Sequence, residues 1–268
     1  MKRGFLVASI LFFVVSSFAG CPPPPPPRPP PPEITSLSLW RAAPGTEVEI
    51  SGEGFFFEAQ NNVVMFGDFV APVVYSSPER LKILVPPVHP LPTLEPEAVG
   101  LTVLTPAGIS PIVSFKVLPL SPPATPGVKT RDVLELLDSL LERLSKEREA
   151  EGLFESIEQA KGSLSEANEL VESIEKEHLQ AIDGVFSNAR LEERLDEVIQ
   201  DLRGTPDISR QSILLAIQAV AKISADVILL ASVPPVGLIY TMSLAVVSAS
   251  MVTLAWYSIT QDLEKQKR

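Results

Sequence analysis

Few side chains in this 268-residue sequence are suited to chemistry. It holds one cysteine, Cys21, and two histidines, His89 and His178. A single thiol has no disulfide partner within the chain, and three such ligands far apart do not match the spacing of a zinc site. The acidic residues are numerous, but they cluster on helix-like segments as solvated faces. The sequence therefore predicts no metal centre and no cofactor site.

The neighbours of Cys21 indicate a different chemistry for its thiol. Lys2 and Arg3 precede an almost wholly apolar run, residues 4–17, and small residues lead up to the cysteine. A basic start, a short apolar segment and a small-residue cleavage zone are typical of a secretory signal. The apolar run is shorter than the roughly 20 residues that span a membrane. We therefore expect residues 1–20 to be a signal peptide.

The string Phe18-Ala19-Gly20-Cys21 resembles the lipobox of bacterial lipoproteins, although Leu is usual where Phe18 stands. The resemblance implies that Cys21 is lipidated and becomes the first residue of the mature chain. Acyl chains contribute about 0.8 kcal/mol per buried CH₂, so several of them hold a protein firmly at a bilayer. An ordinary signal peptide with an unrelated cysteine beside it is the alternative.

Ten prolines and Arg28 fill residues 22–32. Such a run adopts polyproline II and rises about 3.1 Å per residue, so it spans roughly 34 Å. We expect residues 21–32 to be a lipid-anchor cysteine followed by a stiff linker that lifts a domain off the membrane. A ligand for a proline-binding module is the alternative.

The charge balance is acidic. The chain has 22 basic and 33 acidic residues, a net charge of −11, which becomes −13 when Lys2 and Arg3 leave with the signal (−11 − 2). Nucleic-acid binding needs clustered Lys and Arg to contact phosphates, so we expect no nucleic-acid partner.

Residues 33–119 carry the pattern of a small β-sandwich. Short runs rich in β-branched residues are separated by turn residues such as Pro44-Gly45. Seven short strands in this order predict an immunoglobulin-like fold. The runs are 34–40, 47–55, 61–69, 71–77, 80–86, 100–106 and 110–118.

The same segment resembles the IPT/TIG family of immunoglobulin-like domains. The matching positions are Pro44, Gly45, Thr46, Val48, Ile50, Gly52, Gly54, Phe55, Val64, Phe66, Gly67, Pro86, Pro87, Val103, Gly108 and Phe115. The proline-rich insert 88–100 is longer than the usual connection. The resemblance implies a module for binding or spacing with no catalytic set. Phe55, Phe66 and Phe115 are expected in the core, and Trp40 at its edge, with an exposed contact as the alternative. Three carboxylates lack the spacing of a calcium loop: Glu53, Glu58 and Asp68.

Residues 129–205 follow a linker, 120–128, and read as long amphipathic helices. Apolar residues recur at spacings of three and four with Glu and Lys between them. The near-heptad spacing permits a coiled coil, although Gly152, Gly162 and Gly184 weaken a single rod. His178 is interpreted as a tolerated seam residue. The apolar positions include Val133, Leu137, Leu140, Leu144, Ile157, Ala160, Leu164, Ala167, Val171, Leu191, Leu195, Val198 and Leu202.

Residues 206–262 predict a hydrophobic helical hairpin turning at Pro234-Pro235, or a transmembrane segment, before a charged tail at 263–268. The stretch 236–260 is uncharged and long enough to cross a bilayer, whereas Lys222 and Asp226 lie four apart and can pair. We favour membrane insertion here, with the core of a soluble bundle as the alternative. A hairpin and a single span stay open, as does the choice of inner or outer membrane. Small residues predict a helix-packing face: Thr241, Ala245, Ala249 and Thr253.

No nucleophile elbow, P-loop or dinucleotide fingerprint occurs in the sequence, so we expect no enzyme. We expect a multidomain protein, all-β and then all-α, at the bacterial cell envelope with its main domain outside the cytoplasm. In the favoured hypothesis it is a lipoprotein whose Ig-like domain binds an envelope protein or a polysaccharide. In the alternative it is a structural membrane component that forms a homo-oligomer through its C-terminal helices, with the Ig-like domain as a spacer.

Overall fold

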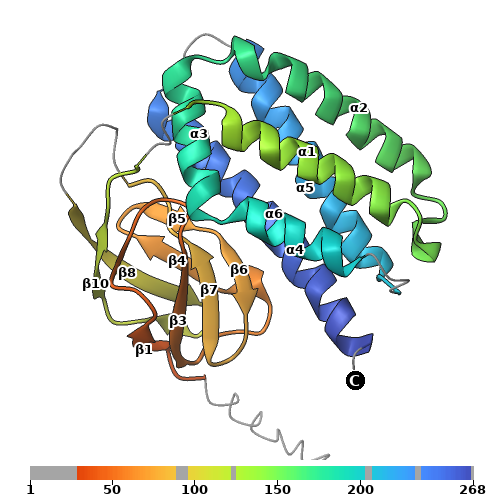
Figure 1. Cartoon of the computed structure of the whole chain (residues 1–268). Coiled ribbons are helices and arrows are strands. Elements are labelled where there is room, and N and C mark those ends of the chain that lie inside the picture. Colours follow the sequence, from red (N-terminus) through yellow and green to blue (C-terminus); the bar gives the residue numbers. More distant parts are fainter. Residues whose placement is uncertain (1–28, 89–95, 122–124, 203–206, 233–236, 267–268) are drawn as a thin grey trace, which may run out of the picture.

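The computed structural model describes residues 29–88, 96–121, 125–202, 207–232 and 237–266. The signal segment, Cys21 and most of the proline run lie outside these residues, as does His89. An all-β part comes first along the chain and a region of six α-helices follows it (Figure 1).

The all-β part is a sandwich of two sheets built from short strands. Its strands are β1 (Glu33–Leu37), β2 (Arg41–Ala42), β3 (Glu47–Glu53), β4 (Val63–Phe66), β5 (Phe69–Ala71), β6 (Val73–Ser76), β7 (Arg80–Leu84), β8 (Glu97–Thr105), β9 (Gly108–Ile109) and β10 (Val113–Val117). Sheet 1 has the order β1-β3-β7-β6, and sheet 2 has the order β2-β10-β8-β4-β5 with β9 paired to β8. All described pairings are antiparallel except the parallel pairing of β10 with β2.

The two sheets enclose a core to which the alternating residues of each strand contribute. Val48 and Ile50 point inward from β3, and Leu81 and Ile83 from β7. The aromatic residues expected in the core are Phe55, Phe66 and Phe115, and all three are buried, which confirms that prediction. The rings of Phe66 and Phe115 meet edge to face at a centroid distance of 5.1 Å, a geometry that stabilises the core beyond the burial of the two rings.

Trp40 differs from the expectation, since its side chain is 56% exposed instead of lying at the edge of the core. It stands in the short connection between β1 and β2, and its carbonyl accepts a hydrogen bond from the backbone N–H of Lys116 at 3.0 Å. The backbone is therefore attached to the sheet while the indole remains in solvent.

The helical region has four amphipathic helices followed by two apolar ones. The helices are α1 (Val128–Leu144), α2 (Phe154–Leu170), α3 (Lys176–Asn188), α4 (Leu191–Asp201), α5 (Arg210–Ser232) and α6 (Leu238–Gln266). The predicted amphipathic segment is thus broken into four pieces that fold back on one another. One break contains Gly152 at φ 81°, and another contains Arg190 at φ 55°. Such left-handed residues end a helix, because the next residue cannot continue its hydrogen bonding.

α5 and α6 form an antiparallel hairpin, and the amphipathic helices lie in front of it in the view of Figure 1. α2 packs on α5, α3 and α4 pack on α6, and α1 packs on α4. α5 and α6 are long and apolar enough to cross a membrane by length and composition alone. In their most apolar windows, however, 44% and 56% of the residues are buried inside the protein.

Two helix starts are capped by carboxylates from other helices. Asp183 of α3 accepts hydrogen bonds from the N–H of Gly127 at 2.6 Å and from the N–H and hydroxyl of Thr130 at 2.8 and 2.6 Å. Asp262 of α6 accepts from the N–H and the hydroxyl of Ser209 at 3.0 and 2.6 Å. The first N–H groups of a helix lack partners within it, so both carboxylates stabilise the helix starts and fix the packing of the helices.

The helical core extends onto the sandwich, because Val74 and Leu84 of sheet 1 pack with helical residues, whereas the space between the two sheets forms a separate core. α6 lies against β6, and the tight turn at Gly45 approaches α3. A Cβ atom at Gly45 would stand 2.6 Å from the carbonyl oxygen of Val185, and the backbone there has φ 86°. Glycine is therefore required at this turn for two reasons, its conformation and the closeness of α3.

Candidate functional site

The histidine in the described part of the chain makes contacts that pack two helices together. His178 of α3 is 7% exposed, and its Nδ1 atom lies 2.6 Å from the hydroxyl of Thr241 on α6. Its Nε2 atom lies 3.7 Å from a carboxylate oxygen of Glu175. The described residues contain no group of three or more His, Cys, Asp or Glu side chains that could hold a metal ion.

The four small residues predicted as a helix-packing face all lie buried within the bundle. The hydroxyl of Thr241 meets His178 of α3, and the hydroxyl of Thr253 accepts a hydrogen bond from Arg194 of α4 at 3.0 Å. Because α3 and α4 of the same chain pack against these residues, the face is closed to a second copy. All four are at most 4% exposed: Thr241, Ala245, Ala249 and Thr253.

The predicted pair of Lys222 and Asp226 on α5 is present as an ion pair. Asp226 is 9% exposed and also accepts a hydrogen bond from the hydroxyl of Ser248 on α6 at 2.6 Å. The carboxylate is therefore compensated twice where α5 meets α6, which is what a buried charge requires.

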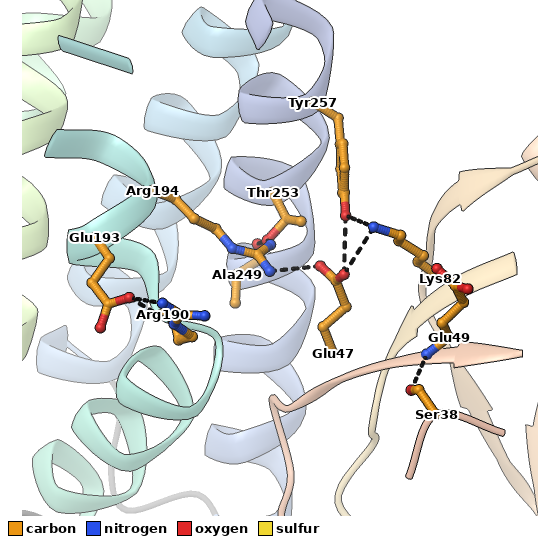
Figure 2. Close-up of polar contacts among 10 residues, drawn as sticks. All are labelled: Ser38, Glu47, Glu49, Lys82, Arg190, Glu193, Arg194, Ala249, Thr253 and Tyr257. Atoms are coloured by element: carbon orange, nitrogen blue, oxygen red, sulfur yellow. Dashed lines mark hydrogen bonds and ion pairs between the residues drawn. The ribbon is translucent and has the colours of Figure 1, made fainter. Parts of the chain in front are cut away.

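A polar cluster joins the sandwich to the helices (Figure 2). Glu47, the first residue of β3, accepts a hydrogen bond from Arg194 of α4 at 2.6 Å and one from the Tyr257 hydroxyl of α6 at 2.9 Å. Lys82 of β7 donates to the same Tyr257 hydroxyl at 2.8 Å. Arg194 also lies over the ring of Trp256, with its guanidinium carbon 5.0 Å from the ring centre. We call Glu47, Lys82, Arg194 and Tyr257 the interface cluster.

Burial and charge both act on the interface cluster. Burial lowers the pKa of Lys82, but the hydrogen bond to Tyr257 and the charges of Tyr257 and Glu47 outweigh it, so the pKa lies above its ordinary value. Burial raises the pKa of the Tyr257 hydroxyl, and the neighbouring Glu47 carboxylate raises it further, against the opposing effect of Lys82. Both groups thus keep their protons to a higher pH in the folded protein, and the cluster holds the sandwich and the helices in one fixed arrangement.

The outer face of sheet 2 carries apolar side chains in contact with solvent. In the strand register, Val63 of β4 lies opposite Leu104 of β8, and Leu104 lies opposite Ile109 of β9. Met65 of β4 lies opposite both a threonine of β8 and Val70 of β5. The neighbouring residues Val64, Phe66, Leu101 and Val103 point the other way, into the core. We call this set the sheet-2 face: Val63, Met65, Val70, Leu104, Ile109 and Ile112.

The most exposed members of the sheet-2 face are Val70, Ile109 and Ile112, at 59%, 61% and 76%. The β10–β2 edge of the same sheet carries Lys116 opposite Arg41, and both side chains are exposed. Sheet 1 differs, since its outer face meets α6 near β6 through the polar Glu47 and Lys82 and through the apolar Val74 and Leu84. The outer face of sheet 2 is apolar and solvent-exposed, with a basic edge.

Sequence reasoning missed both the interface cluster and the sheet-2 face. Glu47 and Arg194 are 147 positions apart, and no local pattern connects them. The run Val63–Phe66 is apolar at every position, so alternation could not show which of its side chains face outward. A weaker signal was present in the sequence, since these strands hold more aliphatic residues than one buried face needs.

Comparison with known proteins addresses the sandwich. Residues 32–117 match the sequence model of the IPT/TIG domain. These residues form an IPT/TIG domain. The family match and the two-sheet structure agree with the resemblance drawn from the sequence, and within the described residues the IPT/TIG domain is followed by six helices.

Two solved structures are similar to the IPT/TIG domain. The TIG domain of human nuclear factor of activated T-cells, cytoplasmic 4, is 21% identical with a TM-score of 0.29, covering 33% of this chain and 89% of that one. An auxiliary nutrient binding protein from Bacteroides thetaiotaomicron is 21% identical with a TM-score of 0.26, covering 33% of this chain and 20% of that one. No curated protein matches the chain. IPT/TIG domains are Ig-like modules for binding or spacing and are generally non-catalytic.

Proposed function

We propose that this chain is a non-catalytic lipoprotein of the bacterial cell envelope that binds a protein partner through the sheet-2 face of its IPT/TIG domain. The observation that carries the proposal is the gathering of six apolar side chains on the solvent side of one sheet. Single exposed apolar residues are normal, whereas a contiguous exposed patch indicates an interaction site.

The chemistry of the sheet-2 face favours a protein over a polysaccharide. Its members are aliphatic residues and one methionine, which pack well against apolar side chains. Sugars are typically bound by hydrogen-bonding groups, which Val70, Ile109 and Ile112 do not supply. The basic edge of Arg41 and Lys116 adds a charge preference, so the expected partner presents apolar side chains beside carboxylates.

The position of the chain entry supports a tether. β1 begins at one end of the sandwich, and the helices lie at the other side of the domain (Figure 1). A linker at 21–32 would reach the domain at the end remote from the bundle. Pro30, Pro31 and Pro32 already lie against the sandwich at Gly54 and Gly108, so lipid on Cys21 would hold the domain at most about 25 Å from the bilayer, the length of residues 22–29 in polyproline II.

For the helices we propose the core of a bundle in place of membrane insertion. The side chain of Tyr257 bonds to charged groups of the sandwich, and that of Thr253 bonds to Arg194. Asp226 and Asp262 lie buried against other helices. Charged partners along α6 are costly in hydrocarbon, and the amphipathic helices already cover much of its surface.

The sheet-2 face is tested by placing a photo-crosslinking amino acid at Val70 or Ile109 in the full chain, in cells. One discrete protein adduct is expected from these two positions and none from Glu79, an exposed position at the far end of sheet 1. The adduct is expected to disappear when Val63→Asp is added. Equal adducts from Glu79 would contradict the proposal. The tether is tested by mass spectrometry of the purified protein, which is expected to show an N-terminal, lipid-modified Cys21.

A further inference from the structure

We propose that the partner of the sheet-2 face is a protein held in the same membrane as Cys21, and that the prolines before the sandwich set the distance from the bilayer at which the two meet. We call residues 22–32 the proline stalk. The proposal rests on the lipid anchor and the binding role proposed above, and it adds the location of the partner.

The last prolines of the stalk lie across one end of the sandwich. A Cβ atom at Gly54, which follows β3 of sheet 1, would stand 3.1 Å from the Cα atom of Pro32 and 3.4 Å from the carbonyl oxygen of Pro31. A Cβ atom at Gly108, in β9 of sheet 2, would stand 3.0 Å from the Cβ atom of Pro31. The stalk therefore contacts both sheets, and these contacts keep the sandwich from swivelling about the point where the chain enters it.

The sheet-2 face begins where the stalk contacts the sandwich. Gly108 directly precedes Ile109, a member of the face that is 61% exposed. Ile112, the most exposed member, lies beside Gly100, since a Cβ atom at Gly100 would stand 3.0 Å from its side chain. From Gly100 to Thr105, which pairs with Gly108, β8 rises about 17 Å at roughly 3.3 Å per residue. The face therefore occupies the part of sheet 2 nearest the stalk.

The contact with α3 lies at the other end of the sandwich. The turn at Gly45, which approaches Val185 of α3, precedes β3, whereas Gly54 follows β3. The seven residues of β3 separate the two contacts by about 23 Å. The sheet-2 face thus lies between the stalk and α3, on the membrane side of the domain.

A stiff stalk of fixed length favours a partner in the same membrane. Residues 22–29 span about 25 Å, so every member of the face lies within about 42 Å of the lipid. A flexible Gly- and Ser-rich linker would anchor the domain equally well and let it search a larger volume for a soluble partner. When two sites on one molecule bind the same surface, the linker raises the effective concentration most if its length matches the span between them. The lipid and the sheet-2 face are two such sites, and this gain compensates for the small size of an aliphatic patch.

Lengthening the stalk tests the proposal with the full chain in cells. A photo-crosslinking amino acid is placed at Ile109, and eight prolines are inserted after Pro27, which adds about 25 Å to the stalk. The protein adduct per chain is expected to fall about five-fold or more, because the face then stands too far from a partner fixed in the bilayer. The same eight prolines appended after Arg268 are the matched control and are expected to leave the adduct unchanged. An equal adduct from the lengthened stalk overturns the proposal and leaves the binding role standing, whereas no adduct from the parent stalk overturns the binding role itself.

A second measurement locates the partner without changing the stalk. Membranes that carry the full chain with the crosslinker at Ile109 are washed in high salt, returned to low salt and only then irradiated. A partner held in the membrane survives the wash, so most of the adduct is expected to remain. Glu79 is the control position, since its carbonyl accepts a hydrogen bond from the N–H of Gly52 at the stalk end of the other sheet, and no adduct is expected from it. Loss of the Ile109 adduct after the wash, or an adduct to phospholipid in place of a protein, overturns the proposal.

Discussion

Arg194 of α4 and Glu47 of β3 form an ion pair of 2.6 Å between two parts of the chain that differ in fold class. Their side chains are only 12% and 20% exposed. In such surroundings an ion pair has lost most of its hydration, so each charge depends on the other. The pair also holds Tyr257 and Lys82 in place, and it makes the orientation of the IPT/TIG domain on the bundle specific.

Glu47→Gln is expected to destabilise the protein by about 2–3 kcal/mol, because Arg194 then lacks a compensating charge. The value lies below that of a fully buried pair, since both side chains keep some exposure. Urea unfolding measures the loss. Glu53→Gln, the same change at the exposed end of the same strand, is the control and is expected to stay within about 0.5 kcal/mol of the wild type. An equal loss from both variants would show that the ion pair contributes nothing specific.

The interface cluster also predicts a loss of stability at alkaline pH. The folded protein raises the pKa of Tyr257, by burial first, and that of Lys82. A raised pKa contributes stability that is fully present below the ordinary value and is lost as the pH rises through the folded value. For tyrosine and lysine the loss therefore begins near pH 10, their ordinary range of about 10 to 10.4.

Urea unfolding between about pH 8 and pH 11 checks this dependence. In Tyr257→Phe the tyrosine contribution is absent, so the alkaline decline is expected to be shallower. Tyr240→Phe, on the exposed side of α6, is the control that keeps the wild-type slope. If the alkaline loss of stability is unchanged in Tyr257→Phe, it arises from other titrating groups.

The sandwich could be predicted from the sequence because its strands are short, β-branched and separated by turn residues such as Pro44-Gly45. The sequence did not show which side chains of each strand point into the core and which point to solvent. Runs such as Val63–Phe66 are apolar on both sides, and only the pairing of β4 with β8 shows that Val64 and Phe66 are the inward pair.

In the helical region, the sequence likewise did not show which segments far apart in the chain contact one another. Apolar spacing predicted helical faces, and the glycine at 152 does lie in a break, but Gly162 and Gly184 lie within α2 and α3. A helix tolerates glycine where tertiary packing compensates its flexibility. At Gly184 the compensation is visible, since a Cβ atom there would stand 2.9 Å from the side chain of Leu120. Such contacts link distant segments and leave no local trace in the sequence.

Asp183→Ala is expected to cost about 2–4 kcal/mol, because three donors at the start of α1 lose their acceptor together. Two of them are backbone N–H groups, of Gly127 and Thr130, that the helix itself cannot satisfy. Thermal unfolding checks the loss, and Asp138→Ala on the exposed side of the same helix is the control. A change no larger than that of the control would contradict the capping role.

Asp262 predicts a loss of stability in acid. Burial raises the pKa of its carboxyl, but the hydrogen bonds from Ser209 and Ser212 outweigh it, and the pKa lies below its ordinary value. A depressed pKa contributes stability that is present above about pH 3.9 and is lost as the pH falls through the folded value. Asp262→Asn is expected to flatten the acid limb of a urea-midpoint curve, whereas Glu264→Gln, exposed on the same helix, is expected to leave it steep. The same limb in both variants would rule out Asp262 as its source.

Removal of residues 1–28 is expected to release the protein from the membrane. The described chain forms its core from residue 29 onward, and about half of the most apolar window of α5 and of α6 is already covered by protein. Insertion of α5 and α6 into hydrocarbon would break the contacts that compensate the buried carboxylates of Asp226 on α5 and Asp262 on α6, which is costly. A chain that begins at residue 29 is therefore expected to stay in the supernatant after ultracentrifugation without detergent, with the helical circular dichroism of the full chain. If it instead sediments with membranes and resists carbonate, α5 and α6 insert into the bilayer by themselves.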